Sequence, residues 1–362
     1  MKQSLIILLP GKPSLKFVEH IKYSVEGFSY CIVSSISEMP NLQNKKILWA
    51  VELDQMGFNL ALEKMLIYLG QQGQTIMKDA IAGIIIQTPS EIGTKSTAYR
   101  IIFQTNQLGC RYMGHPVVEA TRDLVNFLSW QKQLQLPLVE IYRKRSLDLV
   151  QRLIKYDPPR LKKPRVLVLY SNPRKTSNTL MLWNMVKYYF PKKINHLKER
   201  HVENGTIVDC RGCLYKTCRH YSEKRSCFYG GIVVQEILPA IERADFIIWL
   251  CPNYNDSVSA KLMAVINRMT VLYRRVNLNK KTFFAIIVSG SSGSENVAMQ
   301  LIGALNVNKG IQLPPKFTLM ATANDPGAIK QVAFIREKAN NFAVDMYREM
   351  FVLNAKNIFQ KK

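Results

Sequence analysis

Short apolar segments alternate with amphipathic segments along almost the whole 362-residue chain, and this alternation restricts the fold more than any other feature. The run VLVLY at residues 166–170 is typical, with a polar turn and a helical pattern of apolar residues after it. A short, uniformly apolar run fits a strand buried on both faces. Strands that alternate with helices predict a doubly wound parallel sheet with helices on both faces, an α/β fold.

The periodicity locates the expected elements. We expect strands at residues 5–9, 30–34, 47–53, 81–87, 166–170, 246–251, 283–289 and 317–321. We expect helices at residues 14–25, 56–69, 96–108, 117–134, 147–154, 179–190, 233–243, 257–274, 296–305 and 328–350.

Length and composition predict two domains, because 362 residues exceed what one core usually organises. Pro158 and Pro159 stop a helix and stiffen the chain. We therefore predict a first domain at 1–156, a basic linker at 157–164 and a second domain at 165–362. No apolar run approaches the ~18 residues of a membrane span, and Pro10 and Gly11 end the short run at 5–9. We expect a cytoplasmic protein without a membrane partner.

The net charge is +24, and basic residues concentrate between residues 142 and 166. The basic residues there are Arg143, Lys144, Arg145, Arg152, Lys155, Arg160, Lys162, Lys163 and Arg165. A nucleic-acid face is one interpretation. However, no nucleic-acid-binding motif is present, and a solvated face or an anionic ligand accounts for the same charge. We rank nucleic acid low among the partners.

Three predicted strands of the second domain each end in a polar loop. The first, from Ser171 to Ser177, precedes a helix, where unpaired N–H groups and the helix dipole favour a phosphate. An ordinary helix cap uses the same residue types. The loops at 252–256 and 289–293 follow the other two strands. Because ligands bind at the carboxyl ends of strands in doubly wound sheets, three such loops favour a ligand site. In the first domain, residues 88–96 and Gly114-His115-Pro116 are instead interpreted as a helix cap and a tight turn.

Four of the seven cysteines lie within eighteen residues: Cys210, Cys213, Cys218 and Cys227. In a cytosolic chain, such a cluster indicates metal or redox chemistry more than disulfides.

Several of these segments resemble a known family. They are Ser171-Asn172-Pro173-Arg174, Ser177-Asn178-Thr179, the cysteine cluster, Ala244-Asp245, Pro252-Asn253-Tyr254 and Asn267-Arg268. Together they resemble NAD(P)H-dependent FMN reductases of the flavodoxin fold, and more closely the branch that includes the iron–sulfur flavoproteins. The resemblance covers the second domain. The first domain resembles a second flavodoxin-like domain in strand order, without the flavin loops.

The resemblance implies a set of FMN-binding residues. The phosphate would contact the first loop through Ser171, Arg174, Thr176, Ser177, Asn178 and Thr179. The ring would lie along the second loop, formed by Pro252, Asn253, Tyr254 and Asn255. The third loop would close the other side of the flavin with Ser289, Gly290, Ser291 and Gly293. Catalysis would rest on the flavin and not on a protein acid or base.

The resemblance also implies a [4Fe–4S] cluster on the four cysteines. Their spacing of two, four and eight intervening residues departs from the compact iron–sulfur pattern. An all-cysteine zinc site and unligated thiols stay open as alternatives.

The expected function is FMN-dependent oxidoreduction from NAD(P)H to an unknown acceptor. The oligomeric state stays open, and the resemblance makes a homodimer one option, since reductases of this fold often pair across the flavin. The first alternative is an iron–sulfur flavoprotein that carries electrons between redox proteins. The second is a non-enzymatic basic binding module.

Overall fold

The computed structural model describes residues 5–159, 161–172, 174–190, 196–202 and 207–351. The chain divides into two compact units. Unit 1 comprises Met1–Asp157 and Asn306–Lys316, and unit 2 comprises Pro158–Leu305 and Phe317–Lys362. Arg160 of the predicted linker and Pro173 of the predicted phosphate loop lie outside the described residues.

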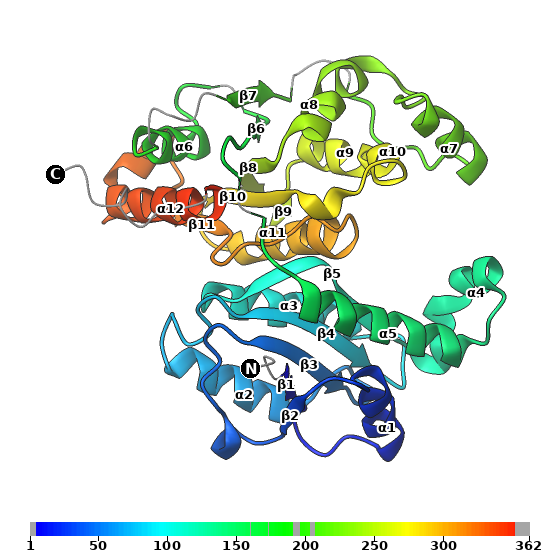
Figure 1. Ribbon diagram of the computed structural model, residues 1–362. Coiled ribbons are helices and arrows are strands. Elements are labelled where there is room, and N and C mark those ends of the chain that lie inside the picture. The colour runs from blue at the N-terminus through cyan, green and yellow to red at the C-terminus, as the bar shows by residue number, and fades with distance from the viewer. Residues whose placement is uncertain (1–4, 160, 173, 191–195, 203–206, 352–362) are drawn as a thin grey trace. The chain divides into compact units, whose positions relative to one another are not determined.

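Each unit is built on one twisted parallel sheet with helices against it (Figure 1). In unit 1 the strand order is β2-β1-β3-β4-β5, with every neighbouring pair parallel. This is the flavodoxin order of doubly wound sheets. The strands are β1 (Leu5–Leu8), β2 (Tyr30–Val33), β3 (Lys46–Glu52), β4 (Ile81–Gln87) and β5 (Arg111–Ala120).

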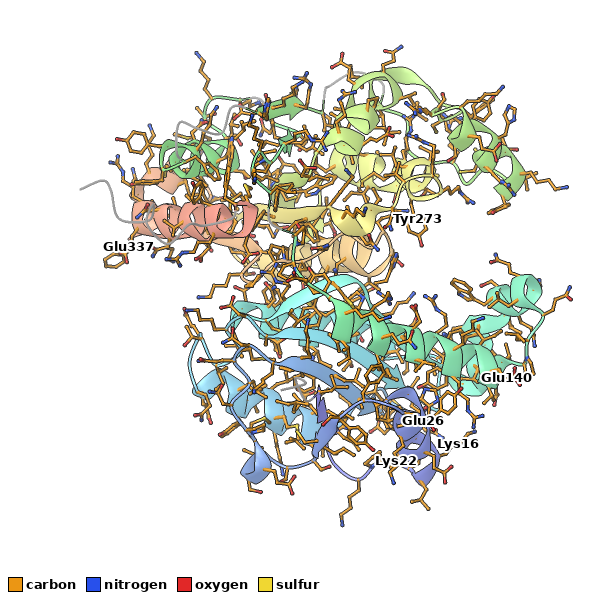
Figure 2. The ribbon with its side chains drawn as sticks, in the orientation of Figure 1. Lys16, Lys22, Glu26, Glu140, Tyr273 and Glu337 are labelled. Carbon is orange, nitrogen blue, oxygen red and sulfur yellow. The ribbon has the colours of Figure 1, made fainter. Side chains whose placement is uncertain are left out.

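The helices of unit 1 are α1 (Leu15–Ser24), α2 (Leu60–Gln71), α3 (Thr94–Gln107), α4 (Leu128–Leu134) and α5 (Leu138–Lys155), with 3₁₀ turns η1 (Ile36–Glu38) and η2 (Arg122–Phe127). Helices α1 and α5 bury their apolar faces against one side of the sheet. The polar face of α1 carries Lys16 and Lys22, which are exposed, as is Glu26 just after the helix (Figure 2). This division between an apolar and a charged face is what the helical periodicity predicts.

Unit 2 repeats the topology. Its parallel strands lie in the order β11-β10-β8-β6-β7, again the flavodoxin order. The strands are β6 (Val166–Tyr170), β7 (Leu197–His201), β8 (Phe246–Tyr254), β10 (Thr282–Ser289) and β11 (Thr318–Thr322), with the short β9 (Ser257–Val258) antiparallel to β8. The two parallel sheets confirm the predicted fold class.

The helices of unit 2 are α6 (Asn178–Tyr188), α7 (Tyr215–Glu223), α8 (Leu238–Arg243), α9 (Ala260–Arg268), α10 (Thr270–Tyr273), α11 (Ser294–Leu301) and α12 (Ile335–Met350). Shorter helical segments are η3 (Val233–Ile237), η4 (Leu278–Lys280), η5 (Ile302–Val307) and η6 (Ala328–Gln331). Helices α6 and α12 pack on one face of the sheet, where Trp183 and Phe342 join the core formed with β6, β8 and β10.

Three sequence predictions were wrong in detail. The predicted helix at 117–134 begins too early, because Val117 and Val118 continue β5 and pair with β4, and the helical residues start only with η2 and α4. Gly114-His115-Pro116 therefore lies inside a strand and forms no tight turn. The predicted helix at 257–274 begins instead with β9, and α9 starts only at Ala260. Periodicity also missed β7, because this edge strand is charged and only partly buried.

Residues 306–316 belong to unit 1 although they interrupt unit 2 in the sequence. The backbones of Tyr112 and Leu313 exchange two hydrogen bonds, at 3.0 and 2.9 Å. The buried Asn306 side chain donates to the Met113 carbonyl at 3.0 Å, and Asn106 donates to the Pro314 carbonyl at 2.6 Å. The start of β5 is therefore completed by a segment almost 200 residues later in the chain.

The contact between β5 and this segment generates the first prediction. A Cβ atom at Gly114 would lie 1.8 Å from the Gly310 carbonyl oxygen, so Gly114→Ala forces two backbones apart. We expect the free energy of unfolding to fall by about 1–3 kcal/mol, the usual cost of overpacking. Chemical denaturation measures this change.

The control for that experiment is Gly70→Ala in α2. A Cβ atom there meets nothing within 4 Å. Because alanine is the better helix former, this variant should be neutral or gain up to about 1 kcal/mol. An equal loss of unfolding free energy in both variants would contradict the close approach of the two backbones at Gly114.

A second prediction concerns His20, which α1 buries against α5. Its ring stacks on Tyr142 with centroids 3.7 Å apart, and its Nε2 lies 2.9 Å from Ser146 Oγ. Burial, with a smaller contribution from the charge of Arg143, lowers the pKa of His20 from 6.5 to about 4. His20 is therefore neutral in the folded protein at neutral pH.

Between pH 6.5 and about 4 the unfolded chain binds a proton at His20 that the folded chain does not. The free energy of unfolding should therefore fall as the pH falls through this range, by about 3 kcal/mol from this residue. Denaturation across the range should show a smaller loss in His20→Gln than in the wild type. Burial also lowers the pKa of His115, so some loss remains in the variant.

Candidate functional site

The carboxyl ends of β6, β8 and β10 meet at one edge of the sheet in unit 2, because these strands are parallel neighbours. Ser171 follows β6 directly and is almost fully buried, as is Ser259, which immediately precedes α9. Their hydroxyl oxygens lie 3.0 Å apart. This contact joins the first polar loop to the start of α9.

A cavity of about 480 Å³ opens beside this contact. Its lining residues are Ser171, Asn172, Arg174, Tyr254, Ser259, Ala260 and Lys261. The structure thus brings together Ser171 and Arg174 of the first predicted loop with Tyr254 of the second. The predicted set did not include Asn172, Ser259 and Lys261, although the run Ser257–Ser259 after a strand end was a usable signal.

The loop before α6 is shaped by its own side chains. Asn172 Oδ1 accepts the Arg174 N–H at 3.1 Å, and Ser177 caps the helix by accepting the Leu180 N–H at 3.4 Å. Thr179 is 4% exposed, whereas Thr176 and Arg174 are exposed. The loop therefore presents the Arg174 guanidinium toward solvent at the N-terminus of α6.

Asn178 holds this loop to the residues that follow β11. Its amide donates to the carbonyls of Ala323 at 3.0 Å and Asp325 at 2.9 Å, and its Oδ1 accepts the Ile329 N–H at 3.2 Å. All of these partners are backbone groups. The side chain of Asn178 is thus engaged in shaping the loop, and direct contact of this side chain with a phosphate stays a prediction.

The second loop is a tight hairpin. β8 continues through Pro252 and Asn253 to Tyr254, and then Asn255 and Asp256 turn the chain into β9 with φ values of 51° and 54°. A two-residue turn with both φ angles positive matches the twist of antiparallel strands, and asparagine and aspartate tolerate it. Tyr254 stands at the end of β8 and is 51% exposed, where it lines the cavity.

Asn253 connects this hairpin to the third loop. Its Nδ2 donates to Ser289 Oγ at 3.0 Å, to the Ser292 carbonyl at 2.9 Å and to Asp256 Oδ1 at 3.2 Å. Its Oδ1 is buried and has no hydrogen-bond partner within the described residues. Gly293 fits against this cluster because its φ is +84° and a Cβ atom there would lie 1.7 Å from Asp256 Oδ1.

Removal of this connection is the third prediction. Asn253→Ala deletes three hydrogen bonds, and we expect the free energy of unfolding of unit 2 to fall by about 1–3 kcal/mol. Asn255→Gly is the control, because Asn255 is exposed, and glycine adopts its positive φ readily. Thermal unfolding should show a lower midpoint only for Asn253→Ala.

Gly290 and Ser291, the other predicted residues of the third loop, are exposed. A Cβ atom at Gly290 would lie 2.9 Å from Asn324 Oδ1. The third loop therefore touches the residues after β11, while Ser289 is fully buried and accepts the amide of Asn253.

The predicted metal site is not supported. Within the described residues, no three cysteine, histidine, aspartate or glutamate side chains are grouped so that they could hold a metal ion. Cys210 is exposed, and Cys213, Cys218 and Cys227 are partly exposed; all four are free thiols. Cys213 lies 3.7 Å from the Tyr229 hydroxyl.

Asn267 and Arg268, which contributed to the family resemblance, hold the cysteine segment in place. Arg268 is 2% exposed and donates to the carbonyls of Val208 at 3.2 Å and Gly230 at 2.7 Å. Asn267 donates to both carboxylate oxygens of Asp209. These bonds connect the residues on either side of the four cysteines, at 208–209 and 230, to the C-terminal end of α9.

Several basic residues of the segment 143–165, the basic strip, form contacts within the fold. Arg152 pairs with Asp148 at 2.9 Å and donates to the carbonyls of Gly114 and His115. Arg145 lies over the Trp130 ring, and Arg165 forms a bidentate pair with Asp245. Arg165 and Lys281 lower the pKa of the Asp245 carboxyl against the opposing effect of its burial. These contacts weaken the nucleic-acid interpretation of the strip.

No helix in the described ranges combines the length and the apolarity that a membrane crossing requires.

Unit 2 is a flavodoxin-like α/β domain whose polar loops and cavity lie at the carboxyl edge of its sheet, the position where such folds bind their ligands.

Residues 164–325 match the model of the NADPH-dependent FMN reductase family. This match lies in the C-terminal half of the chain and confirms the resemblance to FMN reductases seen in the sequence. No curated protein matches the chain significantly.

Solved structures similar to this half include an FMN-dependent NADH-azoreductase from Bacillus anthracis in complex with FMN, with 13% identity and a TM-score of 0.37 over 51% of this chain and 99% of that one. An NAD(P)H:quinone oxidoreductase from Methanothermobacter marburgensis has 13% identity and a TM-score of 0.40, over 51% of this chain and 96% of that one.

Proposed function

We propose that unit 2 binds FMN at the carboxyl edge of its sheet and transfers electrons from NAD(P)H to a separate acceptor. The observation that carries this proposal is the cavity formed by Ser171, Arg174 and Tyr254, which come from two loops 80 residues apart. When bound, FMN would supply the redox chemistry, and the protein would supply binding and orientation.

The residues around the cavity fit the groups of FMN. Arg174 offers a guanidinium fork at the N-terminus of α6, and both features favour a phosphate. Tyr254 offers an exposed aromatic face at the end of β8.

Neither alternative function gains support from a specific contact. An iron–sulfur cluster needs cysteine ligands that are grouped together, and no such group occurs within the described residues. The binding-module alternative relies on the basic strip, several of whose charges are paired. The acceptor, the choice between NADH and NADPH, and the homodimer stay predictions.

The first test is the absorbance spectrum of anaerobically purified protein, with iron and acid-labile sulfide measured on the same sample. We expect flavin bands, FMN as the extracted flavin, no stoichiometric iron, and oxidation of NADH or NADPH with a quinone, an azo dye or free FMN as the acceptor. A chain that neither carries nor takes up flavin contradicts the proposal.

The fourth prediction is a loss of flavin affinity in Arg174→Ala. Removal of one charged hydrogen bond to the phosphate should weaken FMN binding about 10- to 100-fold. Lys175→Ala is the control, because it removes the same charge from an exposed neighbour that does not line the cavity. Titration of the apoprotein with FMN measures both affinities, and with riboflavin the Arg174→Ala loss should disappear.

A further inference from the structure

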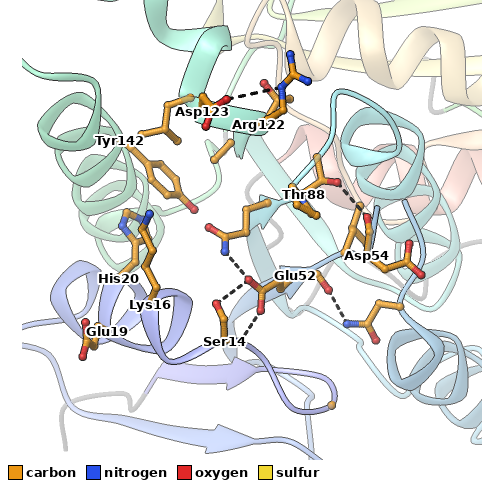
Figure 3. A pocket seen from close by; sticks show the side chains of 18 of the residues that line it. Ser14, Lys16, Glu19, His20, Glu52, Asp54, Thr88, Arg122, Asp123 and Tyr142 are labelled. Carbon is orange, nitrogen blue, oxygen red and sulfur yellow. Dashed lines mark hydrogen bonds and ion pairs between the residues drawn. The ribbon is translucent and has the colours of Figure 1, made fainter. Parts of the chain in front are cut away.

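Unit 1 contains a cavity of about 860 Å³ at the carboxyl edge of its own sheet (Figure 3). The ends of β3, β4 and β5 line it together with the loop after β1, the start of α1 and the first turns of α5. All lining residues lie between Gly11 and Arg143, so the cavity belongs to unit 1 alone. Doubly wound sheets bind their ligands at this edge.

A carboxylate already occupies the N-terminus of α1. Glu52, at the end of β3, accepts the Ser14 N–H at 2.5 Å and the Ser14 hydroxyl at 2.8 Å. It also accepts the Gln87 amide at 2.6 Å. Because this helix terminus is the position that would otherwise favour a phosphate, the negative charge of Glu52 opposes a phosphate there.

The Tyr142 side chain points from α5 into the same cavity (Figure 3). It is 4% exposed, and its buried hydroxyl has no hydrogen-bond partner in the described part of the chain. Burial, with a smaller effect of Glu52, raises the pKa of Tyr142, so the hydroxyl keeps its proton and can donate it to a ligand. A buried hydroxyl without a partner is unfavourable, which gives a ligand acceptor at this point a strong advantage.

Three exposed apolar side chains line the cavity. Phe58, Leu60 and Val139 line it and are 59%, 77% and 46% exposed. Such side chains lose unfavourable contact with water when a ring covers them. Asp123 and Leu124 also line the cavity, both with positive φ, a strained arrangement that is common at ligand sites.

Of the two arginines that line the cavity, Arg122 is paired with carboxylates, whereas Arg143 keeps its charge and packs on an aromatic ring. Arg122 lies 3.7 Å from Asp123 and 3.5 Å from Glu91, and Arg143 lies over the Tyr23 ring. Lys12 and Lys16 also line the cavity and are exposed. Carboxylates, amides and hydroxyls line it together, among them Glu52, Gln87 and Tyr142.

We propose that this cavity binds an uncharged, nucleoside-like ligand and rejects the same ligand when it carries a 5′-phosphate. Its ring would cover Phe58 and Leu60, a carbonyl or ring nitrogen would accept the Tyr142 hydroxyl, and sugar hydroxyls would donate to Glu52. The site is independent of the flavin cavity in unit 2.

The test is calorimetric titration of the full chain with adenosine, guanosine, cytidine and uridine, and with their 5′-monophosphates. We expect at least one nucleoside to bind, and its monophosphate to bind about tenfold more weakly or worse. Tyr142→Phe should weaken the nucleoside about 2- to 10-fold, the effect of one lost hydrogen bond. Arg174→Ala, in the other unit, should leave nucleoside binding unchanged.

Glu52→Gln provides the complementary variant. It keeps the size of the side chain and removes the charge. The difference in affinity between the nucleoside and its monophosphate should therefore shrink or reverse. Thermal unfolding of each variant confirms that the chain is folded. The proposal is overturned if no nucleoside binds at millimolar concentration, if the monophosphate binds the wild type better, or if Tyr142→Phe and Glu52→Gln, both folded, leave the affinities unchanged.

Discussion

The parallel pairing of strands is the constraint on which the rest of this structure depends. β8 pairs along its length with β6 on one side and β10 on the other, in parallel register. Parallel pairing requires a crossover after each strand, so helices cover both faces and every strand ends at the same edge. Loops that are distant in sequence meet there, which is how Ser171 comes to lie beside Ser259, and Asn253 beside Ser289.

The two units share this topology and differ in the chemistry at the start of their first helix. In unit 2, Arg174, which lies on the loop before α6, lines a cavity without a carboxylate among its lining residues. In unit 1, the Glu52 carboxylate accepts hydrogen bonds from the N–H and the hydroxyl of Ser14 at the N-terminus of α1. One charged side chain at a helix terminus therefore separates a phosphate-compatible edge from an edge that favours uncharged ligands.

Much of the fold was predictable because both the strands and the helices carry short-range patterns. The buried strands at 81–87 and 166–170 agree with the prediction residue for residue, since uniform burial gives a uniform apolar run. The edge strand β7 was missed, because LKERH carries no such run. Leu180 and Trp183 show the apolar face of α6 directly in the sequence.

The sequence by itself determined the α/β class, the two repeated halves, and the loops of unit 2 that resemble flavin reductases, because local periodicity and loop composition encode these features. Only the tertiary structure decided three others. Residues 306–316 complete unit 1, Asn178 bonds to the loop after β11, and Tyr142 and Glu52 meet in one cavity. Each of these depends on contacts across 90 or more residues, and no local pattern records which distant partner a side chain will meet.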